Sequence, residues 1–182
     1  MPARPAASTA LGDHARASDL YAHALAMWRG PALAEMTSRA IQDAAAALNV
    51  QRLLAIEGKA EADIQLGRHD EVIAMLSPAS AANPLQERLC GVLMLALYRR
   101  GARAEALSVY GKGHQAVATE LGLPPSLQLR RLQDLIFHDD PALWTQSPNS
   151  LLSVGSEVGH ARHLRLHGAG ARTGQGEAVA VA

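Results

Sequence analysis

A pattern that recurs 34 residues apart limits the possible folds of this chain more than any other feature. The segment from Leu66 to Leu76 aligns with the segment from Arg100 to Tyr110 at a constant offset (101 − 67 = 34). Each copy has a glycine, a glutamate four residues later, and bulky apolar residues after that. This is the period of the tetratricopeptide repeat, in which pairs of antiparallel helices stack on one another. The pattern therefore predicts an all-α, tetratricopeptide-like helical repeat bundle.

Composition favours the same fold class. Aromatic residues make up 3% of the chain, and β-branched residues are sparse, so the chain has few good strand formers. Apolar residues recur at helical spacing through the middle of the chain, and glycines and prolines separate these stretches. The spacing predicts about six helices, at roughly 20–28, 38–66, 70–81, 84–100, 103–121 and 126–138.

The fourth of these helices has the clearest signals. Asn83 is a capping residue, Pro84 suits the first helical position, and Gln86 stands where a capping box has Glu or Gln. From Leu89 to Tyr98 almost every residue is apolar. A helix that is apolar all round is covered on several sides, so we expect this one at the centre of the fold.

The two ends of the chain lack this pattern. Residues 1–11 are rich in Pro, Ala and Ser, and residues 145–182 contain few large apolar side chains. Such segments bury too little apolar surface to offset the entropy lost on ordering. We therefore expect disordered ends at 1–11 and 145–182, and one domain over residues 12–144.

Charge and composition also exclude several functions. The 17 basic residues balance 17 acidic ones, whereas a domain that holds DNA by itself usually has a basic surplus. We therefore expect no sequence-specific DNA binding by this chain alone. No serine has a strand-turn-helix context, and Gly111-Lys112-Gly113 lacks the spacing of a phosphate loop.

These patterns indicate a protein that is not an enzyme, with no catalytic, cofactor-binding or metal-binding residues. His160, His163 and His167 share a helical spacing, but they lie in the segment expected to be disordered. The N-terminus has no signal-peptide pattern and no apolar run reaches the length of a membrane span. A cytoplasmic protein without a membrane partner is expected.

Several longer segments resemble a known family. They are Leu25 to Leu33 (LAMWRGPAL), Glu61 to His69 (EADIQLGRH), Asn83 to Tyr98 (NPLQERLCGVLMLALY), Arg103 to Leu107, Glu120 to Leu123 and Asp140 to Leu143. In order and spacing they resemble the bacterial transcriptional activator domain of the Streptomyces antibiotic regulatory protein (SARP) family of transcription regulators. The resemblance implies a tetratricopeptide-like domain that follows a winged-helix DNA-binding domain and supports transcription activation.

The resemblance also implies partners. They are a winged-helix DNA-binding domain, a second protomer or RNA polymerase. Too few residues precede Trp28 to hold a winged-helix domain, so we expect that domain to be lost or supplied elsewhere. Two alternatives stay open: a free-standing tetratricopeptide scaffold that binds another protein, and a truncated remnant without stable function. Gly58, Gly111 and Gly113, inside predicted helices, would each cost about 1 kcal/mol relative to alanine if exposed.

Candidate partner-binding residues lie where the fourth helix gives way to the fifth. Arg99, Arg100 and Arg103 form a local basic cluster there, which could contact an acidic partner, although solvated helix ends are the simpler interpretation. We expect a docking face on the first helix of each repeat unit, with Asp63 and Gln65 among its polar positions.

Overall fold

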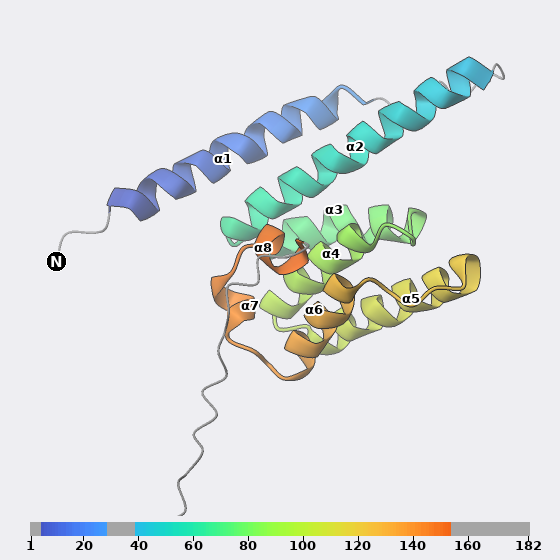
Figure 1. The fold of residues 1–182 in the computed structure, drawn as a ribbon. Coiled ribbons are helices and arrows are strands. Elements are labelled where there is room, and N and C mark those ends of the chain that lie inside the picture. The colour runs from blue at the N-terminus through green and yellow to red at the C-terminus, as the bar shows by residue number, and fades with distance from the viewer. Residues whose placement is uncertain (1–4, 29–38, 154–182) are drawn as a thin grey trace, which may run out of the picture.

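The chain folds as a stack of antiparallel helices (Figure 1). The computed structural model describes residues 5–28 and 39–153. Within these ranges there are eight helices and no strands. Their bounds are α1 Pro5–Ala26, α2 Arg39–Gln65, α3 His69–Ala82, α4 Glu87–Arg99, α5 Arg103–Leu121, α6 Leu127–Phe137, α7 Ala142–Thr145 and α8 Pro148–Leu152. The predicted all-α, tetratricopeptide-like class is confirmed, with α2–α3 and α4–α5 as the two repeat units.

The repeat is visible at the turns within these units. Gly67 (φ 76°) ends α2 and Gly101 (φ 87°) ends α4. Both have a left-handed backbone conformation that strains any residue with a Cβ. This requirement explains why glycine recurs at an interval of 34 residues.

The predicted capping signals had different outcomes. Ser126 caps α6, since its side chain accepts a hydrogen bond from Leu129 N at 3.3 Å. The prediction for Asn83 was wrong, because α4 begins only at Glu87. Asn83 instead donates to the Ala79 carbonyl at 2.9 Å, and Gln86 N donates to the Asn83 carbonyl at 3.0 Å. Residues 83–86 therefore form a turn between α3 and α4 rather than the first turn of α4.

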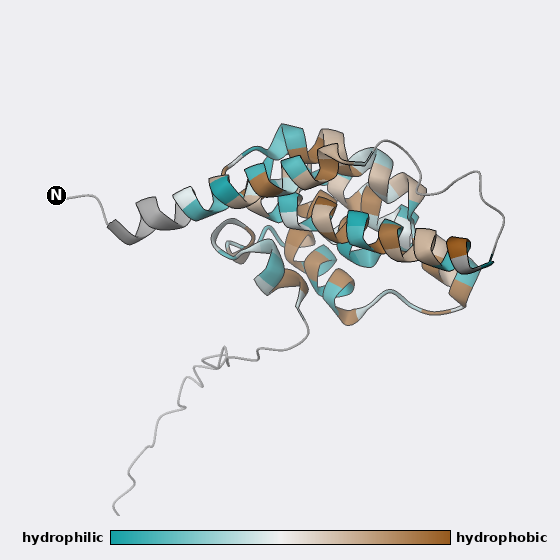
Figure 2. Cartoon of the chain, turned by 90° about the horizontal axis from the view of Figure 1, so that it is seen from above, coloured by the Kyte–Doolittle hydropathy of each residue, from teal (hydrophilic) through white to brown (hydrophobic). Residues whose placement is uncertain are grey.

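The core is centred on α4, as its apolar run predicts. Every residue from Leu89 to Tyr98 is buried, and the helix packs on α2, α3, α5 and α6. Complete burial of a leucine stabilises the folded state by roughly 1.5–3 kcal/mol, so this one helix accounts for much of the apolar driving force. Figure 2 shows hydrophobic and hydrophilic residues alternating along the other helices, as expected for helices with one buried face.

The helical region is longer than predicted at both ends. Residues 5–11, expected to be disordered, belong to α1, and residues 145–152, also expected to be disordered, lie in α7, α8 and the turn between them. Leu151 and Leu152 are buried against the core, which the expectation of a disordered tail from 145 missed. Residues 1–4 and 154–182 lie outside the described residues.

The first helix packs along α2 and explains one of the helix-internal glycines. A Cβ at Gly58 would collide with the ring of Tyr21 from α1, its hydroxyl oxygen at 2.6 Å. Gly113 is buried, and a Cβ there would lie 3.4 Å from Cys90 Sγ. These two glycines permit close packing, whereas a Cβ at Gly111 would meet open space. The predicted cost for an exposed helix therefore applies to Gly111 alone.

No helix in the described ranges is both long enough and apolar enough to cross a membrane.

Candidate partner-binding surfaces on opposite faces of α4

Two stripes of α4 residues point in opposite directions. At 100° per residue, Arg88, Gly91 and Arg99 lie on one side of the helix, and Cys90, Leu93 and Leu97 lie on the side about 180° away. α8 packs on the first stripe and on the neighbouring surfaces of α2 and α6. We call this surface, formed by α4, α2 and α6, the covered face. The second forms the floor of an open groove between α3 and α5.

Gly91 makes room for the C-terminal segment on the covered face. A Cβ on Gly91 would lie 2.6 Å from Leu152 Cδ2 and 3.0 Å from Leu152 Cδ1. Leu152 is 9% exposed and Leu151 is 7% exposed, although they belong to a helix of five residues. The glycine in the middle of the apolar run therefore leaves space for the side chain of a leucine that lies 61 residues further along the chain (152 − 91 = 61).

Arg99 holds the chain that leads into α8. Its Nε donates to the Leu143 carbonyl at 2.8 Å and its Nη2 to the Gln146 carbonyl at 2.7 Å. Burial lowers the pKa of the Arg99 guanidinium below its usual value, as expected for a cation removed from water. Arg99 was predicted to bind a partner, and its hydrogen bonds go instead to this chain's own C-terminal segment.

Arg88 connects α8 to α2 from the same stripe. Its Nε lies 3.2 Å from Glu57 Oε2, and it also forms an ion pair with Glu61. A third contact runs from Arg88 Nη2 to Asn149 Oδ1 at 3.1 Å. Burial raises the pKa of Glu57, while the Arg88 charge opposes that increase. One guanidinium therefore links two acids on α2 to the first turn of α8.

The other two predicted arginines point elsewhere. Arg100 lies 3.2 Å from Asp70 Oδ1 at the start of α3 and 3.5 Å from Glu105 Oε2 at the start of α5. Arg103 donates to the Phe137 carbonyl at the end of α6. Arg99, Arg100 and Arg103 are neighbours in the sequence but contact three different parts of the molecule. The structure does not bring them together as one basic cluster.

The open groove lies between α3 and α5, which both pack on α4. It has a volume of about 510 Å³, within the range typical of binding pockets. Apolar side chains form most of its surface, and Glu105 and Lys112 of α5 stand at one wall. The residues that line it are Ile73, Ser77, Ser80, Ala81, Pro84, Cys90, Leu93, Leu97, Glu105, Ser108, Val109, Lys112 and Gly113. Arg100 spans the end where both helices begin, through Asp70 and Glu105.

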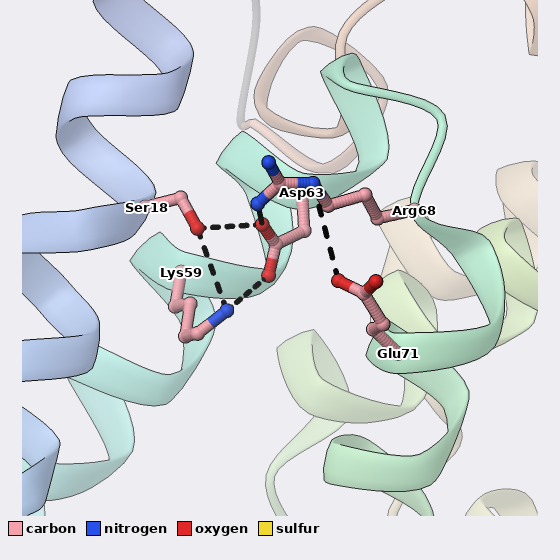
Figure 3. Close-up of polar contacts among 5 residues, drawn as sticks. All are labelled: Ser18, Lys59, Asp63, Arg68 and Glu71. Atoms are coloured by element: carbon pink, nitrogen blue, oxygen red, sulfur yellow. Dashed lines mark hydrogen bonds and ion pairs between the residues drawn. The ribbon is translucent and has the colours of Figure 1, made fainter.

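Asp63, expected on the docking face, is buried instead, within the group of polar contacts drawn in Figure 3. Its carboxylate accepts a hydrogen bond from the Ser18 hydroxyl at 2.6 Å, pairs with Lys59, and lies 3.3 Å from Arg68 Nη1. A buried carboxylate needs such partners, because one left unpaired costs several kcal/mol. The cluster joins α1, α2 and the turn into α3, so the role of Asp63 is structural.

The described residues offer no metal site, since no three His, Cys, Asp or Glu side chains among them are grouped to hold a metal ion. His160, His163 and His167 lie outside the described residues. Burial raises the pKa of the Cys90 thiol, which keeps it protonated at neutral pH.

Comparison of the sequence with known protein families identifies one match. Residues 3–137 match the family described as the bacterial transcriptional activator domain. The chain belongs to this family.

Individual members confirm the SARP resemblance. The chain is 42% identical over 132 residues to the regulatory protein AfsR of Streptomyces coelicolor, which covers 72% of this chain and 13% of AfsR. It is 35% identical over 133 residues to the regulatory protein DnrI of Streptomyces peucetius, which covers 72% of this chain and 49% of DnrI. The chain thus spans about an eighth of AfsR and about half of DnrI.

A solved member of the family has the same fold. The structure of Mycobacterium tuberculosis EmbR in complex with a low affinity phosphopeptide superposes with a TM-score of 0.71 at 31% identity. The match covers 80% of this chain and 38% of EmbR. The family match ends at residue 137, so α7 and α8 follow the part of the chain that it covers.

Sequence reasoning missed Gly91, Arg88 and the two leucines of α8 as functional candidates. Two signals were available: a glycine inside an otherwise apolar run, and Ser147-Pro148 ahead of Leu151-Leu152, which is a cap and first-turn proline before apolar residues. The sequence does not reveal that these two features meet.

Proposed function

We propose that this chain is the interaction module of a transcription regulator and that it docks to another protein. The partner is a winged-helix DNA-binding domain, a second protomer or RNA polymerase. Family membership supports the regulatory role. The equal numbers of acidic and basic residues support a protein partner rather than DNA.

The open groove carries this proposal. Its apolar floor is formed by the central helix, and Ile73 and Val109, half-buried at its walls, remain accessible to a partner. An amphipathic helix binds in such a groove by inserting apolar residues between two flanking helices. Lys112 is exposed at the wall and forms no ion pair with the described residues. We assign it the contact with an acidic side chain of the partner.

Among the arginines predicted to bind a partner, we assign that role to Arg100 and Arg103. Both are exposed, and Arg100 stands at the end of the groove. Charges at the rim of an interface mostly change association rate and specificity rather than affinity. Arg99 is better described as a positioning residue for α7 and α8.

The test measures association by calorimetry between the full chain and separately produced winged-helix domain or RNA polymerase. Ser108→Trp, at the exposed wall of the groove, should block docking without unfolding the chain. Ala118→Trp is the matched control, since Ala118 is exposed on α5 and does not line the groove. Loss of binding in the first variant alone supports the proposal. Equal binding by both variants would place docking elsewhere, and no binding by the wild type would contradict the interaction role.

A further inference from the structure

The contacts between α4 and residues 142–152 have the character of peptide recognition. Arg99 donates to two backbone carbonyls, of Leu143 and Gln146, which any sequence would present. Arg88 donates to the side-chain oxygen of Asn149, and the missing side chain of Gly91 leaves space for Leu152. Two arginines thus hold the segment by its polar groups, and one glycine admits an apolar side chain.

The segment is held in place by tertiary contacts, with Leu143, Leu151 and Leu152 buried against the core. α7 has four residues and α8 has five, and helices this short do not persist without tertiary contacts. Segments that rest on a few anchoring side chains open more readily than the core to which they are attached. A competing segment that reproduced the same anchors could therefore replace residues 142–152 without unfolding α4.

We propose that the stripe of Arg88, Gly91 and Arg99 is a peptide-binding site that now holds the chain's own residues 142–152. It accepts from a partner protein a segment of the same chemistry: a turn with free backbone carbonyls, then a side-chain acceptor, then two adjacent leucines. The inference deepens the proposed function by adding a second site of partner contact. The open groove does not depend on it.

Occupation by the chain's own segment sets the affinity for an incoming one. Because the segment is tethered to the site, it acts as a competitor at high effective concentration. Binding in trans is weakened by the fraction of molecules in which the site is closed. Substitutions that remove the leucine anchors from the tethered segment therefore strengthen binding of a free peptide.

The experiment uses a fluorescently labelled synthetic peptide of residues 140–153 and the full chain. Fluorescence anisotropy should show weak binding to the wild type and at least about tenfold tighter binding to the Leu151→Asp, Leu152→Asp double variant. Adding Gly91→Leu to the double variant should remove the gain, because the new side chain fills the leucine site. Equal affinity for the wild type and the double variant would overturn the proposal, and so would tight binding that survives Gly91→Leu.

Hydrogen exchange of the wild type tests the same inference without any substitution. Amides of residues 142–152 should exchange faster than those of Leu89 to Tyr98, and faster still in excess unlabelled peptide of residues 140–153, because the bound peptide displaces the tethered segment. Exchange of both segments at one common rate would show that the segment opens only with the whole fold, and would overturn the proposal. Peptide binding is independent of Ser108, so its failure is distinguishable from failure of docking at the open groove.

Discussion

The two faces of α4 differ in what covers them, and the difference follows from a few side chains. The covered face has a glycine at its centre and an arginine at each end, so it accepts a leucine and holds the chain beside it. The opposite face has Cys90, Leu93 and Leu97, and no described element of the chain lies across the groove that they floor. One face of the central helix is thus covered within the chain, and the opposite face forms the floor of an open groove.

The largest expected loss of stability comes from placing a charge inside α4, the helix that carries both faces. Leu93 is 3% exposed and lies at the floor of the open groove. Leu93→Asp should unfold the chain, because an unpaired buried carboxylate costs several kcal/mol, comparable with the stability of a domain. Circular dichroism melts should lack a cooperative transition near that of the wild type. Arg130→Asp, an exposed change on α6, is the control and should melt like the wild type.

Substitutions of the arginines should differ in their cost to stability, according to the groups that each arginine contacts within the chain. Arg99→Gln removes charge-assisted hydrogen bonds to two carbonyls and should destabilise the fold by about 1.5–3 kcal/mol. Arg100→Gln breaks exposed ion pairs with Asp70 and Glu105 and should cost less than about 1 kcal/mol. Urea unfolding measures both. Equal costs would mean that the covered face is no better anchored than the exposed surface.

Substitutions of a glycine in α4 and a glycine in α5 should have smaller effects on stability, and these should be opposite in sign. Gly91→Leu should destabilise by about 1–3 kcal/mol through collision with Leu152, and Leu152→Ala in the same chain should restore part of the loss. Gly111→Ala meets no neighbour and should stabilise α5 by up to about 1 kcal/mol. Denaturant midpoints compare the two. A stabilising Gly91→Leu would show that Leu152 is not seated on Gly91.

Local sequence patterns predicted the repeat units, but they did not predict the contacts through which α7 and α8 pack on the covered face. The glycine spacing of 34 and the run from Leu89 to Tyr98 act through turn geometry and burial, which depend on nearby residues. The meeting of Gly91 with Leu152 depends on where the chain returns after α6, and no local pattern encodes that path. The same reason explains Arg99. Its position on the helix was predictable, but its partner carbonyls belong to residues 143 and 146. The buried role of Asp63 was missed because Ser18 lies 45 residues away.

The smallest effect is a pH dependence of stability that arises at the covered face. Burial raises the pKa of Glu57 above its ordinary value of 4.5, so the folded state holds this proton at a pH where the unfolded chain has released it. Stability therefore falls as pH rises through the folded-state pKa, and the loss is absent below the unfolded value. The side chain of the Glu57→Gln variant cannot ionise. From pH 4.5 to pH 7 the unfolding free energy of the wild type should therefore fall relative to that of the variant. Urea titrations across that range measure the shift, with Glu105→Gln at the open groove as the exposed control. A difference that stays constant with pH would show that Arg88 fully offsets the burial of Glu57.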